Sequence, residues 1–481
     1  MTPVDAPRSR LFTVSLALAT ALIAYWLWVC WCLFPVSGWN DVRLAPSLAL
    51  ARGVSFYPGE RAGAVTTWIY GPLPVLVWWP AAWADSAAHA LEIAGAINIL
   101  TTLAAILAVC AWWPVPAGVR LGWRERGLAA VLALAIWPFA TFQYLQADNV
   151  AIALGLVANL VLVCRPTRAG RWAAAVLAVS GLACKQTSIG VAAAQIVWLG
   201  ATAGPREAAR HLGRCVAAGL LLAGWMAASF DWAGLRMNLI TVPVHLPWAP
   251  DALVRVLDRV PELAVHLVLP ALILIFARRR IWARDSMLLL PSLAWLLALP
   301  TSIAAFFKFG GTLNSLQSLP LWLPPALVAG VAVLRSRRHA AGLLCAGALA
   351  AAAICGIRCV REPRFFTGPS IEHYREAAQL ARALPGQIWF PWEPLVTIYG
   401  ENRFYHVEDG LYMRFLAGHA LTLGHVRQDL PPNLGVIALR RGGVDWGIAL
   451  HLAPPDAKEA EFGLWTLHSW PPPAPAVPPR G

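Results

Sequence analysis

The sequence has little charge and almost no lysine. Only 13% of its 481 residues are charged, whereas 58% are hydrophobic, and a soluble domain needs more polar surface than that. All but three of its 38 basic residues are arginine, the exceptions being Lys185, Lys308 and Lys458. Apolar stretches of about 20 residues, long enough to span a bilayer, recur along the chain. The composition therefore predicts a polytopic membrane protein.

The sequence also lacks the signatures of several enzyme classes. It contains no HExxH, Walker A, GxGxxG or nucleophile-elbow pattern in a suitable context, which argues against a metalloprotease, an ATPase and an enzyme with a nucleotide cofactor. Its nine cysteines all lie in or beside apolar segments, so they form no disulfide framework. Cys355 and Cys359 lie one helical turn apart, but no histidine or carboxylate accompanies them as a further metal ligand.

Arginine clusters set the expected topology. We expect about eleven spans, at 11–34, 87–113, 127–145, 149–164, 171–186, 188–203, 213–230, 260–277, 286–306, 318–334 and 340–358. Arginines gather in alternate gaps, at Arg8/Arg10, Arg120/Arg124/Arg126, Arg165/Arg168/Arg171, Arg206/Arg210/Arg214, Arg278/Arg279/Arg280/Arg284 and Arg335/Arg337/Arg338. The positive-inside rule assigns these gaps to the cytoplasm. The net charge of +13 then reflects orientation in the membrane rather than binding to nucleic acid.

The gaps without arginine clusters are expected outside. The first, at 35–86, is longer than a connector needs to be, and such loops are usually functional or disordered; its Trp, Tyr, Pro and Gly content argues against disorder. Within it, Gly71–Trp83 is apolar but short and carries three prolines. We expect this stretch to be a re-entrant or interfacial helix, because a full span there would invert the later gaps. A second outer loop, Asp231–Val260, ends in an amphipathic stretch at 251–260.

The chain divides into three parts. Residues 1–358 form the predicted all-α transmembrane domain, and residues 359–470 are polar enough to form a small α/β domain outside the membrane. Here Ser370–Leu384 predicts a helix with Ser370 as its N-cap. Short strands are predicted at 387–390, 434–439, 445–450 and 462–468. Residues 471–481 are a proline-rich tail, predicted to be disordered.

Two outer aspartates are candidate catalytic residues. Asp41 follows the first span by about seven residues, and a carboxylate there could act as a general base or hold a metal ion. The alternative is a turn residue in the Asn-Asp pair. Asp148 opens a span, where it could equally serve as an ordinary N-cap. A charge deeper in the bilayer costs about 2.5–3.5 kcal/mol, so Asp148 is expected at the boundary or facing a polar cavity.

The candidate substrate-binding residues lie in the same outer gaps. Lys185 and Lys308 stand at the outer ends of spans, where an ammonium could neutralise a phosphate or simply anchor to lipid headgroups. Lys308 precedes a flexible Gly-Gly pair, with Asn314 beyond it. The remaining candidates, each of which could instead be a turn or loop residue, are Tyr70, Arg236 and His245.

The order of these features resembles the GT-C superfamily of membrane glycosyltransferases. The resemblance covers most of the chain. It rests on the first span with a long outer loop and early Asp41, the proline-containing segment YGPLPVLVWWP, the aspartate of QADNVAIAL and the polar domain after the last span. In the lipid-modifying branch an acidic-Lys-Pro-Pro motif opens the interfacial helix. Here Ile69-Tyr70-Gly71-Pro72 takes its place, so Lys185 or Lys308 would have to bind the donor phosphate.

The resemblance implies a GT-C fold with its active site on the periplasmic face of a bacterial inner membrane and an N-terminus in the cytoplasm. A sugar would pass from a polyprenyl phosphate to a lipid, glycan or protein hydroxyl, with inversion. Asp41 would be the base and Asp148 the second acidic residue; a divalent metal between them is compatible but not required. Two alternatives remain open, a transporter or flippase, and a non-catalytic scaffold. Polar residues at the outer boundary rather than at mid-bilayer disfavour transport.

Overall fold

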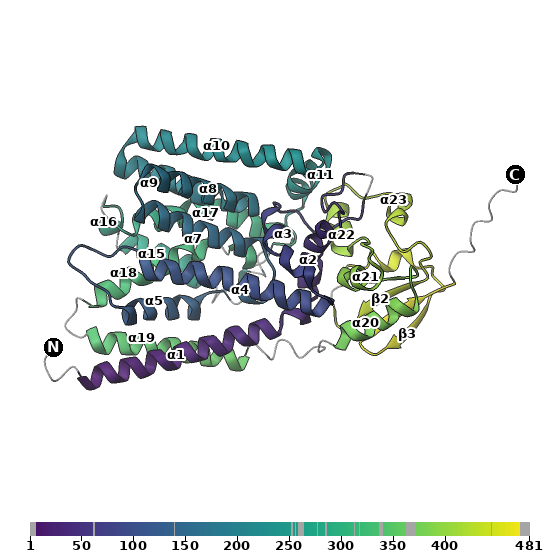
Figure 1. Ribbon diagram of the computed structural model, residues 1–481, viewed down its shortest axis with the longest axis horizontal. Coiled ribbons are helices and arrows are strands. Elements are labelled where there is room, and N and C mark those ends of the chain that lie inside the picture. Colours follow the sequence, from purple (N-terminus) through teal and green to yellow (C-terminus); the bar gives the residue numbers. More distant parts are fainter. Residues whose placement is uncertain are drawn as a thin grey trace, which may run out of the picture.

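The protein consists of a long helical bundle and a small mixed domain at one end of it (Figure 1). The computed structural model describes residues 6–60, 63–138, 140–251, 254, 256–257, 264–276, 278–283, 286–311, 313–316, 318–335, 340–361, 372–443 and 445–471. We call the end of the bundle where α1 finishes at Cys32 and the mixed domain is attached the domain end. The opposite end, where α7 finishes at Cys164, is the far end.

Helices of very different lengths make up the bundle. The long ones are α1 (Ala6–Cys32), α4 (Ala87–Trp112), α5 (Trp123–Ile136), α7 (Ala147–Cys164), α8 (Arg168–Cys184), α9 (Ile189–Ala203), α10 (Pro205–Ser229), α17 (Leu289–Phe307), α18 (Leu323–Arg335) and α19 (Ala340–Arg361). The short ones are α6 (Ala140–Gln143), α11 (Trp232–Arg236), α12 (Val242–His245), α15 (Leu269–Phe276) and α16 (Arg278–Ile281). Between α11 and α12 the chain forms a π-helical turn at Met237–Thr241.

Seven segments of the described chain are helical, long and apolar enough to cross a membrane. They include α1, α4, α7, α10, α17 and α19, together with the segment Asn314–Arg335 that contains α18. Four further predicted spans coincide with helices that are too short by this measure, α5, α8, α9 and α15. At about 1.5 Å per residue, the 17 residues of α8 fall slightly short of a ~30 Å hydrocarbon core. The count of about eleven spans therefore stays a prediction.

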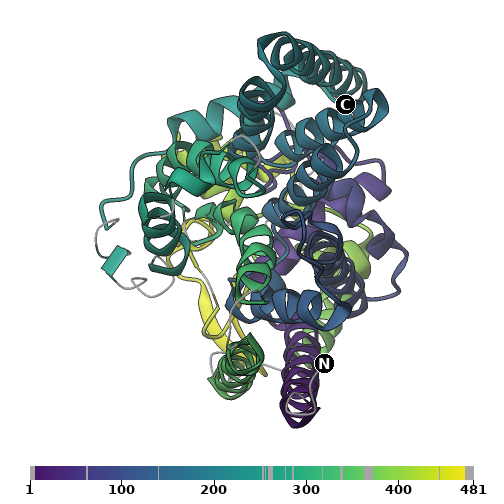
Figure 2. The same ribbon diagram turned by 90° about the vertical axis from the view of Figure 1, so that its left-hand side faces the viewer.

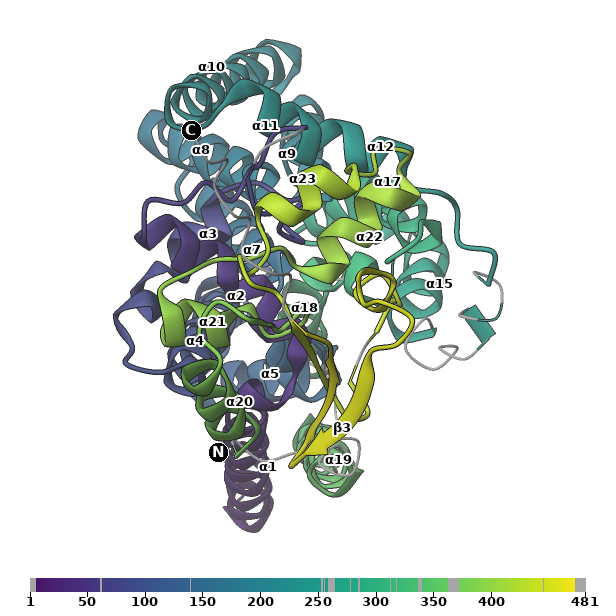
Figure 3. The same cartoon turned by 90° about the vertical axis from the view of Figure 1, so that its right-hand side faces the viewer.

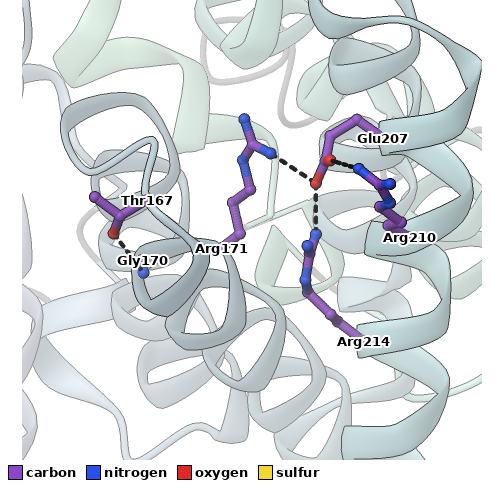
Figure 4. Close-up of polar contacts among 6 residues, drawn as sticks. All are labelled: Thr167, Gly170, Arg171, Glu207, Arg210 and Arg214. Carbon is purple, nitrogen blue, oxygen red and sulfur yellow. Dashed lines mark hydrogen bonds and ion pairs between the residues drawn. The ribbon is translucent and has the colours of Figure 1, made fainter.

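Local sequence signals explain where several of these helices begin and end. Ser86 caps α4 by accepting a hydrogen bond from the His89 N–H, and Thr167 caps α8 in the same way from Gly170 (Figure 4). The predicted span 127–145 is interrupted because α5 stops just before Trp137-Pro138. The ring of a proline disfavours the helical conformation of the residue before it. In Figure 2 the bundle is seen end-on, with α1 and α19 side by side at one edge.

Arginines stabilise the far end of the bundle around one carboxylate. Glu207, in the first turn of α10, accepts hydrogen bonds from Arg214 at 2.7 Å and pairs with Arg171 of α8 at 2.8 Å (Figure 4). Arg210 pairs with the same carboxylate at 3.5 Å. An acidic residue in the first turn also complements the helix dipole. These contacts join the start of α8 to the start of α10.

Residues 35–86, predicted as the first outer loop and called the first outer segment below, form short helices and turns where they are described. This segment contains α2 (Gly38–Ala51), α3 (Leu73–Val77) and a 3-10 helix at Trp79–Trp83. The predicted interfacial stretch at 71–83 is thus two short helical pieces separated at Trp78. Figure 3 shows the mixed domain lying over α2 at the domain end, where α21 contacts α2. The length of this segment is explained by its position, since it forms the layer between bundle and domain.

In the residues that the structure describes, the mixed domain has four α-helices and a four-stranded sheet. The helices are α20 (Glu372–Ala383), α21 (Pro394–Glu401), α22 (Glu408–Leu416) and α23 (Leu423–Gln428), and the strands are β1 (Ile388–Trp389), β2 (Val436–Arg440), β3 (Lys458–Phe462) and β4 (Trp465–Ser469). The sheet order is β1-β2-β4-β3. β1 pairs with β2 in parallel, and the other two pairings are antiparallel. The predicted small α/β domain is therefore observed.

Some details of this domain differ from the sequence-based predictions. The strand predicted at 445–450 is wrong, because this stretch is turn and the start of a 3-10 helix. β3 was not predicted, because all five of its residues are exposed and it shows no apolar alternation. The predicted Ser370 cap, the tail after Trp470–Pro471 and most of the stretch 251–260 lie outside the described residues, as do Arg284, Arg337 and Arg338.

Candidate functional site

Three of the predicted site residues meet at the domain end of the bundle. Asp148 lies in the first turn of α7, and Lys185 directly follows α8. The Lys185 ammonium donates to both carboxylate oxygens of Asp148 at 2.7 Å. The same Nζ lies 5.5 Å from the centroid of the Tyr70 ring. Both side chains of the ion pair are buried, and the two hydrogen bonds between them hold the pair in place.

The Tyr70-Gly71 turn is held against the end of α8. The Gly71 N–H donates to the Cys184 carbonyl at 3.1 Å. A Cβ on Gly71 would overlap the Ala183 backbone oxygen, so only glycine allows this approach. Gln186 donates to the carbonyls of Ile69 and Leu239, both at 3.3 Å. The Tyr70-Gly71 turn is therefore packed and hydrogen-bonded beside Lys185.

A cavity of about 250 Å³ borders this cluster. We call it the apolar cavity, because its lining is mostly aliphatic or aromatic side chains from α8, α10, α11 and the π-helical turn. These are Leu182, Ala183, Ala223, Met226, Trp232, Leu235, Leu239 and Ile240. Gly71, Gln186 and Arg236 complete the lining. Arg236 is exposed, and no described side chain pairs with its guanidinium.

The apolar cavity lies beside a helix suited to contact with lipid. α10 runs along the edge of the bundle (Figure 1), and its exposed residues include Leu220, Leu221 and Trp225. Apolar side chains are exposed at low free-energy cost where the surroundings are hydrocarbon. The cavity thus combines an apolar wall beside an exposed apolar helix with one cation that no described side chain pairs, an arrangement suited to an amphiphile with an anionic headgroup.

Asp41 occupies a different environment, between α2 and the mixed domain. It is fully buried. The Tyr374 hydroxyl donates to Oδ2 at 2.7 Å, and the Leu395 N–H at the start of α21 donates to Oδ1 at 3.0 Å. Burial raises the pKa of the Asp41 carboxyl well above its ordinary value, and the Leu395 and Tyr374 hydrogen bonds oppose that rise. A substrate hydroxyl could reach Asp41 only if Tyr374 or α21 moved.

A second buried carboxylate lies near Asp41. Glu393 precedes α21 and lies 3.6 Å from the Arg440 guanidinium. Burial raises the pKa of Glu393 to about 7, although the charge of Arg440 lowers it. Arg440 also donates to the Val36 carbonyl at 3.0 Å. Together with the Asp41 contacts, these interactions fasten the mixed domain to the layer formed by residues 35–86.

The other predicted substrate-binding residues lie apart from the apolar cavity. The Lys308 ammonium donates to the carbonyls of Pro243 and Val244 at 2.7 and 2.8 Å. It therefore satisfies the C-terminal end of α12, and partial burial lowers its pKa. His245, the last residue of α12, is exposed. Asn314 is buried and accepts a hydrogen bond from the Ser315 hydroxyl.

The two predicted catalytic aspartates share no partner among the described residues. Asp148 pairs with Lys185, whereas Asp41 accepts hydrogen bonds from the mixed domain. The described chain also holds no group of three or more His, Cys, Asp or Glu side chains placed to bind a metal ion. The geometry thus gives no support to a metal bridge between Asp41 and Asp148.

Sequence reasoning overlooked several residues of these environments. Gln186 follows Lys185 directly and was visible as part of the polar insertion KQTS. Tyr374, Glu393 and Arg440 carried no signal, because they lie in an ordinary amphipathic helix, a loop and a strand of the mixed domain. The aromatic stretch 389–405 is mostly packed inside the domain, with Trp389 1% exposed.

Comparisons with known proteins give likenesses of fold only. No protein-family model matches the sequence, and no curated protein matches it. Among solved structures, the chain is similar to the oligosaccharyltransferase AglB from Archaeoglobus fulgidus in complex with an inhibitory peptide and a dolichol-phosphate. The identity is 11%, the TM-score 0.47, and the match covers 92% of this chain and 70% of that one. An apo-form oligosaccharyltransferase of the same organism matches at 11% identity and a TM-score of 0.44, covering 90% and 69%.

Proposed function

We propose that the protein transfers a glycosyl group from a polyprenyl-phosphate donor to an acceptor hydroxyl at the domain end of the bundle. The observation that carries this proposal is the apolar cavity, whose mostly apolar lining includes the Arg236 guanidinium, which no described side chain pairs, and the Gln186 amide. A polyprenyl phosphate has the matching chemistry, a long apolar chain that ends in an anion. The resemblance of the sequence to GT-C glycosyltransferases supports the same substrate class.

Arg236 is the proposed phosphate ligand. A guanidinium offers several N–H donors in a planar fork that matches phosphate oxygens. Gln186, in the same lining, can donate to a phosphate oxygen if it releases one of its long backbone contacts. Lys185 already donates to both oxygens of Asp148, so we assign it to positioning the Tyr70-Gly71 turn beside the cavity. This differs from the expectation that Lys185 or Lys308 binds the phosphate.

The proposed reaction is a single displacement at the anomeric carbon. The acceptor oxygen forms the new bond to that carbon while the bond to the phosphate oxygen breaks, which inverts the configuration. The negative charge develops on the departing phosphate, and Arg236 stabilises it there. The acceptor proton passes to a general base, for which Asp41 remains the candidate. Asp41 can serve only after Tyr374 or α21 has moved away from its carboxylate.

Binding of a lipid phosphate tests this proposal. We would photo-crosslink a short-chain polyprenyl phosphate with a photoreactive terminal group to the purified full-length protein. The unphosphorylated polyprenol would serve as the ligand control. Arg236→Gln should reduce labelling by about tenfold, the effect of one lost charge-assisted hydrogen-bonded contact. The matched control, Arg382→Gln, alters an exposed arginine of α20 and should leave labelling unchanged. Equal labelling of the wild type and Arg236→Gln would overturn the assignment.

A further inference from the structure

A second cavity, of about 330 Å³, lies between the first outer segment and the mixed domain. We call it the polar cavity, because Glu60, His419, Thr422 and His425 contribute to its lining. Met237 and Leu421 add an apolar wall. The size falls at the small end of the roughly 300–1,000 Å³ typical of small-molecule sites. None of the residues that line it belongs to the apolar cavity.

The two cavities share one structural segment. Leu235, Arg236, Leu239 and Ile240 line the apolar cavity, whereas Met237, from the same turn of chain, lines the polar one. Residues 237–241 form the π-helical turn. π-Helical turns are rare in proteins overall, and those that occur are often found at functional sites. A ligand in the polar cavity would therefore contact Met237, the residue that directly follows Arg236, the proposed phosphate-binding residue.

Local structure fixes the polar groups of this cavity. α22 ends at Leu416, and Gly418 adopts a φ of 75°, which lets the His419 N–H donate back to the Arg414 carbonyl at 2.8 Å. The His425 Nδ1 lies 2.8 Å from the Thr422 hydroxyl, so its Nε2 is left for a ligand. These contacts fix the backbone of His419 and the imidazole of His425 at the rim of the cavity.

The third polar group, Glu60, is positioned by an arginine. The Arg414 guanidinium donates to the carbonyls of Pro58 at 2.8 Å and Gly59 at 2.9 Å. It thereby anchors the two residues that precede Glu60. The positive charge of Arg414 also interacts with the Glu60 carboxylate, although no described side chain forms a salt bridge with it. Glu60 itself is exposed. His245 adds a ring contact to His419, with centroids 5.5 Å apart.

We propose that the polar cavity binds a saccharide, and that this saccharide is the acceptor of the transfer reaction. A carboxylate and two imidazoles offer both acceptors and donors, which matches a ligand whose hydroxyl groups do both. The Met237 and Leu421 side chains provide a surface for the C–H face of a sugar ring. The Glu60 carboxylate gives the cavity hydrogen-bond acceptors, which a phosphate or another anion without donors could not use. The assignment as acceptor rests on the proposed function, whereas saccharide binding itself does not.

Saturation-transfer NMR on the full-length protein tests the inference. The protein would be held in a zwitterionic detergent without a sugar headgroup, and the probes would be the methyl glycosides of glucose, galactose and mannose. We expect saturation transfer to the ring protons of at least one probe. Glu60→Gln and His425→Gln should each weaken its binding by about tenfold, the effect of one lost hydrogen bond to a charged or oriented group. Glu459→Gln and His451→Gln are controls at exposed sites of the same domain and should bind as the wild type does.

The outcomes separate this inference from the proposed function. No signal from any of the glycosides, or equal signals from the wild type, Glu60→Gln and His425→Gln, would overturn the saccharide site. The same preparations would be labelled with the polyprenyl phosphate. Labelling that depends on Arg236 without a saccharide signal would defeat only this inference. A saccharide signal that depends on Glu60 without lipid labelling would defeat the proposed donor site and leave the saccharide site standing.

Discussion

Removal of one partner of the Asp148–Lys185 pair should cost far more stability than removal of both. The two side chains are 2% and 6% exposed, and the Lys185 ammonium donates to both carboxylate oxygens. Lys185→Met would leave the Asp148 charge buried without its cation, at a cost of about 3–5 kcal/mol. Combining Asp148→Leu with Lys185→Met replaces the pair by apolar side chains, which in buried pairs is often neutral or stabilising.

Thermal unfolding of the purified protein in detergent measures this order. The single variant should unfold at a clearly lower temperature than the wild type, and the double variant should recover most of the loss. Arg441→Met provides a control, because the Arg441–Glu461 pair is exposed and such pairs contribute only about 0–1 kcal/mol. A single variant as stable as the wild type, or a double variant as unstable as the single, would refute the description of a buried, isolated pair.

Three further predictions concern the contacts around the site. Gly71→Ala should destabilise the protein by roughly 1–3 kcal/mol because its methyl group overlaps the α8 backbone, whereas Gly59→Ala, in open space, should not; thermal unfolding compares them. Asp41→Ala should accelerate hydrogen exchange at the Leu395 amide, and an unchanged rate would contradict the contact. The stability of the wild type should fall as pH rises from about 5 to 7, because the raised pKa of Glu393 favours its protonated form in the folded state. Glu393→Gln should flatten that slope, and an unaltered slope would contradict the assignment of the pH dependence to Glu393.

Most of the bundle could be predicted from the sequence because the bilayer demands long apolar runs. α4, α7 and α17 lie where hydropathy predicts them, within a few residues. α2 was missed because nearly all of its residues from Gly38 to Ala49 are buried between bundle and domain, so no polar face marks a helix. The mixed domain was predicted only in outline, since its exposed strand β3 has no apolar pattern.

The candidate site shows the same division. Asp148 and Lys185 are only 37 residues apart and stand at neighbouring ends of consecutive antiparallel helices, so their pairing could have been anticipated from the topology. The partner of Asp41 could not, because Tyr374 lies 333 residues further along the chain. Neither cavity is visible in the sequence, since each is lined by segments that only the fold brings together.

The central claim is that a lipid-linked sugar donor is bound by Arg236 and consumed. The most direct test is mass spectrometry of lipid-linked sugars and envelope glycans in a deletion strain that carries the wild type, Arg236→Gln or Arg382→Gln at equal expression. The account predicts that a sugar modification is lost on deletion, restored by the wild type and Arg382→Gln, and largely absent with Arg236→Gln. Full restoration by Arg236→Gln, or no change on deletion, would contradict it and favour the transporter or scaffold alternatives.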